Sequence, residues 1–260
     1  MMWWRFPIRT ALLAGAVIAA PGPAAAQIAL GETGLRFTGN AQVASDYLFR
    51  GISQTRSRVA YLTNLELNHT SGVYVGAFVA NLRFAGMDAR QEIDVLAGHR
   101  FTLAGFSLDI GGVWYTYPGT TTARGQYGLN YVEGVLKVSR DIGQVTMGAL
   151  LAASPNFFAS SGTGIYGEGG VDWRSGLHDI VLGGRLAYQS IARNARFGTP
   201  DYAWWGLTAS RDFVIDGLGT INGLVGYYQT SIDRAQCVPL NGRGQDICGA
   251  RAFGSLSFRF

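Results

Sequence analysis

RAFGSLSFRF, residues 251–260, is the stretch at the end of the chain that decides the predicted fold. Counting back from Phe260, Phe258 and Leu256 fall on one face, and Arg259 and Arg251 fall on the other. Alternation with a period of two is typical of a β-strand that has one apolar and one polar side. The sequence therefore predicts a terminal strand whose apolar face must be covered by protein or by lipid.

The other end of the sequence predicts a cleaved signal peptide over residues 1–26. Arg5 and Arg9 precede an apolar run at residues 11–20, and Ala24-Ala25-Ala26 supplies small residues at the expected cleavage site. The run is short for a membrane span, although a retained anchor helix is the alternative. A secreted chain with a carboxyl-terminal Phe is typical of bacterial outer-membrane barrels. We therefore expect Phe260 to be an assembly signal that is recognised by the barrel-assembly machinery.

The composition favours a membrane barrel over a soluble protein. Charged residues make up only 15% of the chain, which contains 37 Gly and is 12% aromatic. Loss of Arg5 and Arg9 would leave 19 basic and 17 acidic residues, so nucleic acid is not an expected partner. After the signal peptide no apolar run approaches 18 residues, which excludes helical spans.

Alternation and turn residues predict about twelve strands in an up-and-down antiparallel transmembrane β-barrel over residues 27–260. The expected strands are 35–49, 60–69, 73–83, 91–101, 106–117, 128–139, 144–153, 165–174, 179–189, 201–212, 219–230 and 250–260. Short and long connections alternate along the chain. This asymmetry predicts periplasmic short turns, extracellular long loops, and both termini in the periplasm. The alternative is that the apolar face of the strands packs against a second sheet, as in a soluble sandwich.

The polar faces of these strands predict a charged lumen, although the faces of the seventh, tenth and eleventh strands stay unassigned. Acidic and basic residues nearly balance there. One interpretation is a structural network that braces the wall, and the other is a narrow passage lined by opposed charges. The pore-lining candidates are Arg36, Asp46, Arg50, Glu66, Arg83, Glu92, Asp94, Asp109, Glu133, Lys137, Glu168, Asp172, Arg174, Arg185, Arg251 and Arg259.

The first predicted strand continues through the stretch SDYLFRGISQ, residues 45–54. On this basis Tyr47 and Phe49 belong to the outer aromatic girdle. Asp46 and Arg50 then point into the lumen, about 13 Å apart along the strand, so each needs a partner elsewhere. Arg83 is the expected partner of Asp46. Arg50 is expected to pair with Glu92 or Asp94.

Four blocks of sequence resemble the TorF-type porin family over the whole mature chain. They are SDYLFRGISQT, SGVYVGAFVANLRF, EIDVLAGHRF and WYTYPG, in this order. The resemblance implies an outer-membrane barrel that passes small solutes. Arg83 stands where the family pattern leads us to expect an acidic residue, so the charge inside the barrel is expected to differ from that of relatives.

The last long loop contains Cys237 and Cys248, the two Cys of the chain. An oxidising compartment favours a disulfide between them, and a metal or redox role is the alternative. In the preceding long loop, Arg193 and Arg196 are candidates to contact lipopolysaccharide phosphates.

The function that follows is a monomeric porin-like channel for passive diffusion of small polar solutes or ions. A non-conducting barrel that binds a partner or ligand through its loops is the alternative. An enzyme is not expected, because His69, His99 and His178 all fall on the predicted periplasmic side and no G-x-S-x-G motif occurs. The sequence implies no cofactor and no metal. The expected partners are outer-membrane lipid, lipopolysaccharide, the assembly machinery and a small polar solute.

Overall fold

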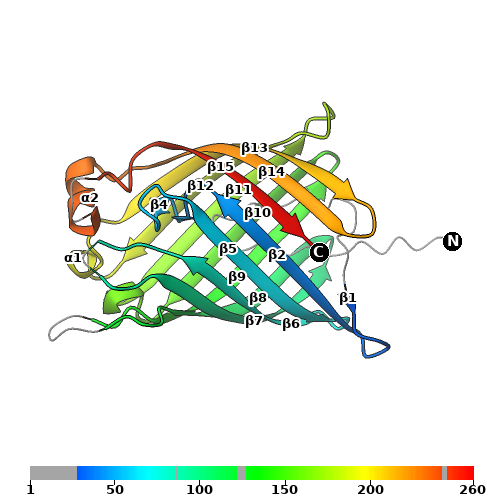
Figure 1. Cartoon of the computed structure of the whole chain (residues 1–260), viewed down its shortest axis with the longest axis horizontal. Coiled ribbons are helices and arrows are strands. Elements are labelled where there is room, and N and C mark those ends of the chain that lie inside the picture. Colours follow the sequence, from blue (N-terminus) through cyan, green and yellow to red (C-terminus); the bar gives the residue numbers. More distant parts are fainter. Residues whose placement is uncertain (1–27, 86, 122–126, 242–244) are drawn as a thin grey trace.

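The computed structural model describes residues 28–85, 87–121, 127–241 and 245–260. The predicted signal peptide, residues 1–26, lies outside the described residues. Within them, twelve long strands form one closed antiparallel barrel (Figure 1). The predicted fold class is therefore confirmed.

Each barrel strand pairs with the next along the chain, and the last pairs with the first. This order is the up-and-down topology that the alternation of turns and loops predicted. The strands are β2 (Leu35–Ala44), β5 (Ala60–His69), β6 (Val73–Asn81), β7 (Gln91–Leu103), β8 (Phe106–Thr116), β9 (Tyr131–Ile142), β10 (Val145–Ser154), β11 (Gly164–Arg174), β12 (Val181–Ile191), β13 (Tyr202–Ile215), β14 (Gly219–Thr230) and β15 (Arg251–Arg259).

Six shorter elements lie outside the barrel wall. β1 (Ile28–Ala29) pairs with the start of β2, which the sequence did not predict. A small hairpin is formed by β3 (Leu48–Phe49) and β4 (Ile52–Ser53). The long loops contain a 3₁₀ turn, η1 (Phe158–Ser160), and two helices, α1 (Asn194–Phe197) and α2 (Arg234–Asn241). Among the described residues, no helix is long and apolar enough to cross a membrane.

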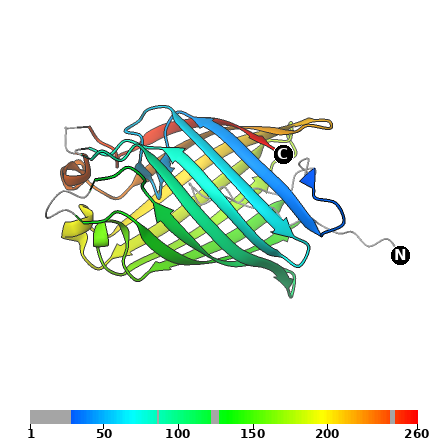
Figure 2. The same ribbon diagram turned by 60° about the horizontal axis from the view of Figure 1, so that its bottom comes forward.

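The two ends of the barrel differ in the way the sequence predicted. Figures 1 and 2 show α1 and α2 at one end, and β1 and the C-terminus at the opposite end. The short turns lie at the end with the C-terminus, where Gly72 has a φ of 95°. A Cβ atom at Gly72 would lie 2.0 Å from the backbone oxygen of Arg100, so this turn requires Gly.

The outer face of the wall is an apolar band. Large exposed side chains from neighbouring strands include Leu186, Leu207 and Val225, each more than 60% exposed. The predicted alternation is confirmed in the assigned strands, since Glu66 and Asp172 are buried inside. The structure also assigns the three strands that the sequence left open: Leu150, Trp204 and Tyr228 face inward from β10, β13 and β14. An apolar exterior and a polar interior are what a membrane barrel requires.

The barrel closes through a short seam between its first and last strands. β15 pairs with β2 only between Ser255–Arg259 and Asn40–Ala44. Beyond Arg259 the backbone of Phe260 exchanges hydrogen bonds of 2.9 and 3.0 Å with Gly39. The Phe260 ring covers Gly39, where an added Cβ would lie 2.4 Å from the ring. The terminal Phe thus completes the seam that the last strand begins.

Candidate functional site

The chain leaves the barrel wall at Ala44 and folds into the lumen before β5 begins at Ala60. We call residues 45–59 the inward hairpin; its core is the β3–β4 pair. Its turn is made by Arg50 and Gly51, which have φ values of 50° and 82°. A Cβ at Gly51 would lie 2.8 Å from Cγ2 of Thr230 and 2.9 Å from Cβ of Trp204, so the tip packs directly against β14 and β13.

The prediction that Tyr47 and Phe49 belong to an outer aromatic girdle is wrong. Tyr47 is 2% exposed, and its hydroxyl donates a 2.8 Å hydrogen bond to Oε1 of Glu92. Burial raises the pKa of Tyr47 well above its usual value, so the hydroxyl remains a donor. Phe49 packs edge-on against Tyr115 at 5.9 Å between ring centroids. The two-residue alternation of the sequence continues through this segment. The alternation therefore does not show where the strand leaves the wall.

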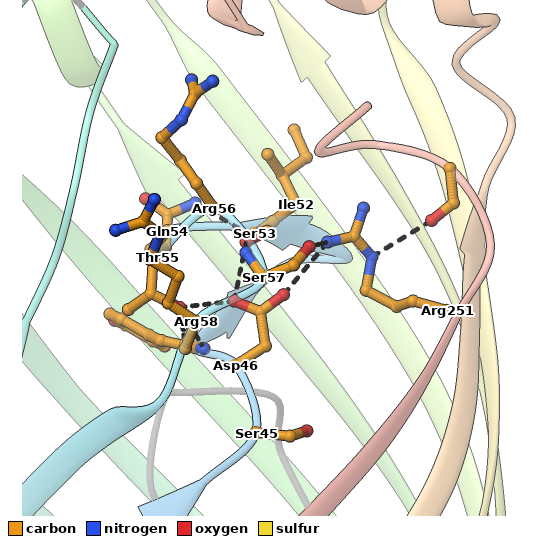
Figure 3. Close-up of polar contacts among 12 residues, drawn as sticks. Ser45, Asp46, Ile52, Ser53, Gln54, Thr55, Arg56, Ser57, Arg58 and Arg251 are labelled. Carbon is orange, nitrogen blue, oxygen red and sulfur yellow. Dashed lines mark hydrogen bonds and ion pairs between the residues drawn. The ribbon is translucent and has the colours of Figure 1, made fainter. Parts of the chain in front are cut away.

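Asp46 holds the base of the inward hairpin (Figure 3). Its Oδ1 accepts hydrogen bonds of 2.6 Å from both Ser53 and Thr55, and its Oδ2 lies 3.0 Å from Arg251 on β15. The predicted pairing of Asp46 with Arg83 is therefore wrong. Arg83 lies beyond the end of β6 with an exposed side chain, and its backbone N–H donates to Gln54.

Arg50 crosses the lumen from the tip of the inward hairpin to the far wall. Its guanidinium lies 2.6 Å from Oε2 of Glu133 on β9 and donates to Oε1 of Gln189 on β12, also at 2.6 Å. It also lies 4.1 Å from the ring centroid of Tyr166. Burial by itself lowers the pKa of Arg50, but the Glu133 carboxylate raises it, so the group stays charged. The predicted partners Glu92 and Asp94 are thus wrong, because the hairpin turns Arg50 toward β9.

Neighbouring segments hold the inward hairpin by its backbone. Ser53 N–H donates to the oxygen of Ile247 at 2.9 Å, and Arg83 N–H donates to the oxygen of Gln54 at 2.7 Å. Ile247 belongs to the last long loop, in which a disulfide joins Cys237 and Cys248. The hairpin is therefore held between the end of β6 and the last long loop.

Aromatic side chains pack around the inward hairpin at the long-loop end of the barrel. Tyr115 and Tyr131 stack with their centroids 4.3 Å apart, and Phe157 lies edge-on to Tyr131 at 4.8 Å. Trp204, at 1% exposed, covers the hairpin tip and donates to the hydroxyl of Tyr166. This end of the lumen is narrowed by a compact core.

Arg100 is the centre of a charge cluster between the inward hairpin and the short turns. It lies 2.7 Å from Glu66 and 3.3 Å from Asp109, and Lys137 lies 3.8 Å from the same Asp109. Its guanidinium also stacks 3.5 Å above the ring of Tyr74. The sequence reasoning missed Arg100, although it shares the inward face of its strand with Glu92 and Asp94.

Further ion pairs line the remaining strands. Arg185 lies 2.8 Å from Asp172 and 4.0 Å from Glu168, which also accepts a hydrogen bond from Tyr166. Two more pairs include acids that were not among the candidates: Arg174 with Asp141 at 3.6 Å, and Arg259 with Asp212 at 2.6 Å. The candidate Arg36 is exposed, on the inward-facing row of β2 close to the short turns.

The long loops are tied to one another. Asp88 accepts hydrogen bonds from both the hydroxyl and the N–H of Thr121, and these bonds lower its pKa. Arg196 donates to the backbone oxygen of Ser160 at 2.9 Å and stacks 3.8 Å above the ring of Tyr127. Because Thr121 and Tyr127 belong to the same loop, these contacts connect four of the long loops in one series.

Solved porin structures share this architecture. The KdgM porin matches with a TM-score of 0.54 and 10% sequence identity, over 86% of this chain and 98% of that chain. The KdgM porin in complex with disordered oligogalacturonate matches with a TM-score of 0.53, 10% identity, and 86% and 97% coverage. The NanC porin matches with a TM-score of 0.53 and 12% identity, over 86% of this chain and 98% of that chain. At these identities the likeness establishes the barrel fold.

Sequence comparison identifies the family without giving it an activity. No curated protein matches the chain. The TorF-type name is not among the matches and stays a prediction. Residues 28–238, most of the chain, match one family over the barrel strands from β1 to β14 and into α2. The chain therefore belongs to the Gcw_chp family, described as bacterial protein of unknown function.

Proposed function

We propose that this protein is an outer-membrane channel through which small polar solutes or ions diffuse passively, as the TorF-type resemblance implies. The observation that carries the proposal is the contrast between the two faces of the wall. Apolar side chains cover the outside, whereas ion pairs follow one another along the inside, from Arg50–Glu133 to Arg259–Asp212. A polar inner wall suits a water-filled passage, and charged side chains along it can set which solutes pass.

The proposal includes the setting of the channel. The short turns and both termini face the periplasm, and the long loops face outward, where Arg193 and Arg196 contact lipopolysaccharide. The protein works as a monomer without a cofactor and is not an enzyme. Its assembly depends on recognition of Phe260 by the barrel-assembly machinery. The seam contact between Phe260 and Gly39 supports this role, since that residue is where the barrel closes.

The test is single-channel conductance of the refolded mature protein in a planar bilayer. We expect discrete current steps for the wild type. Arg50→Ala should give larger steps, because Arg50 spans the lumen between the inward hairpin and Glu133. Correct folding of each sample is checked by heat-modifiable gel mobility. A folded wild type and a folded Arg50→Ala variant that both stay silent would reject the channel.

One observation favours a second function, that of a non-conducting barrel acting through its long loops. The inward hairpin is buried, and aromatic rings surround it at the long-loop end. On this alternative the hairpin is a permanent plug that stiffens a binding surface made by the loops. Silence of both folded barrels, together with retention of a ligand or lipopolysaccharide by the loops, would favour it.

A further inference from the structure

Glu92 and Asp94 differ from the other inward-facing acids of the described residues. Each of the others has a basic partner within 4.0 Å, such as Arg251 for Asp46 or Arg185 for Glu168. Neither Glu92 nor Asp94 has one within the described part of the chain. Both are almost fully buried, at 2% and 3% exposed. The carboxyl groups at this level of the lumen thus have no ion-pair partner among the described residues.

The pair lies where the inward hairpin narrows the barrel. Glu92 and Asp94 are two residues apart on one strand, so their carboxyl groups are neighbours on its inner face. Tyr47 of the hairpin donates its hydroxyl to Glu92 at 2.8 Å. Both carboxyl groups therefore lie on the part of the wall that the hairpin faces.

Unpartnered polar atoms surround the pair. Tyr115 is the register partner of Asp94 on β8, so the two side chains lie side by side on the inner face. Its hydroxyl, in a residue only 1% exposed, has no hydrogen-bond partner among the described residues. The same holds for Oδ1 of Asp94 and for Oε1 of Glu133, whose other oxygen binds Arg50. The two carboxyl oxygens can accept hydrogen bonds or bind a cation, and the Tyr115 hydroxyl oxygen can act as a further ligand.

The charged groups around Glu92 and Asp94 indicate which class of solute the lumen would pass. Of the carboxyl groups of Glu92, Asp94 and Glu133, only that of Glu133 is paired with a guanidinium, that of Arg50. Even with one proton shared between Glu92 and Asp94, the pair keeps a negative charge, because like charges in contact hold one proton between them. We propose that Glu92 and Asp94 form the selectivity site of the lumen, which takes small monovalent cations and excludes anions. The inference rests on the proposed channel and names what passes through it.

The test is the reversal potential of the protein in a bilayer with a potassium chloride gradient. We expect the wild type to prefer potassium over chloride. Glu92→Gln with Asp94→Asn should lower the permeability ratio about thirtyfold, because one unit charge ~4 Å away in water favours the cation about fivefold and disfavours the anion about fivefold. The matched control is Asp179→Asn with Asp216→Asn, which removes two exposed carboxyl groups from the short turns. The control should keep the wild-type ratio.

Two results would overturn the inference: a wild type that prefers chloride, or a ratio that the Glu92/Asp94 variant leaves unchanged. A silent wild type would reject the channel itself, and cation binding is then measured on the folded barrel. The unfolding temperature of the wild type should rise when sodium replaces N-methylglucamine at constant ionic strength. The Glu92/Asp94 variant should lose that rise. An equal rise in both proteins would reject the cation site even in a closed barrel.

Discussion

Arg50 is the residue whose replacement should cost the barrel most stability. Its guanidinium and the Glu133 carboxylate, whose side chains are 5% and 0% exposed, lie 2.6 Å apart. Arg50→Met keeps the length of the side chain but leaves Glu133 as a buried charge without a partner. Removing one member of such a pair typically costs about 3–5 kcal/mol. Loss of the bond to Gln189 and of the stacking on Tyr166 acts in the same direction.

The assay is urea unfolding of the refolded barrel, followed by tryptophan fluorescence and heat-modifiable mobility. Arg259→Met is the matched control, because its pair with Asp212 is partly exposed, at 21% and 26%. Such a pair contributes about 0–1 kcal/mol. Adding Glu133→Gln to Arg50→Met should recover much of the loss, because the unpaired Glu133 carboxylate is then removed. If Arg50→Met costs no more than Arg259→Met, the reasoning about the inward hairpin is refuted.

Three further predictions follow from other parts of the fold. Phe260→Ala should lower the yield of assembled barrel in the outer membrane, because the ring covers Gly39 at the seam; an unchanged yield contradicts the signal role. A cysteine at Ala195 in α1 should react with an impermeant maleimide on intact cells, whereas one at Ser71 should not; reversed labelling rejects the orientation. Reduction of the disulfide should lower the free energy of unfolding by roughly 2–3 kcal/mol in the chain-entropy model; urea unfolding with and without reductant measures it, and equal midpoints would show that the last loop is held by other contacts.

Much of the wall could be predicted because a two-residue period is a strong constraint. Glu66 and Asp172 lie inside, as the alternation predicted, since a slip of one residue would place them in lipid. The strand ends were less predictable. β13, for example, continues to Ile215, three residues beyond the prediction, because β14 supplies hydrogen-bond partners there.

The inward hairpin could not be predicted from the alternation of apolar and polar residues. Tyr47 and Phe49 keep the alternation of the wall, yet the strand stops at Ala44. The partners that draw the chain inward are remote in sequence: Glu92, Glu133 and the oxygen of Ile247. A local sign was present in Gly51, whose left-handed conformation suits a tight turn. Arg100, by contrast, follows the same alternation as Glu92 and Asp94 on its strand. Its inward position could therefore have been predicted from the sequence.

The departure of the chain at Ala44 also has a mechanical consequence for the barrel. β2 leaves the wall after five paired residues with β15, whereas the pairing of β13 with β14 runs from Trp204 to Ile215. The short pairing makes this junction the weakest line of hydrogen bonds along the circumference. We therefore expect thermal opening of the barrel to begin at this junction. The exit of the chain from the wall at Ala44 thus both forms the inward hairpin and shortens the junction at which the barrel is expected to open.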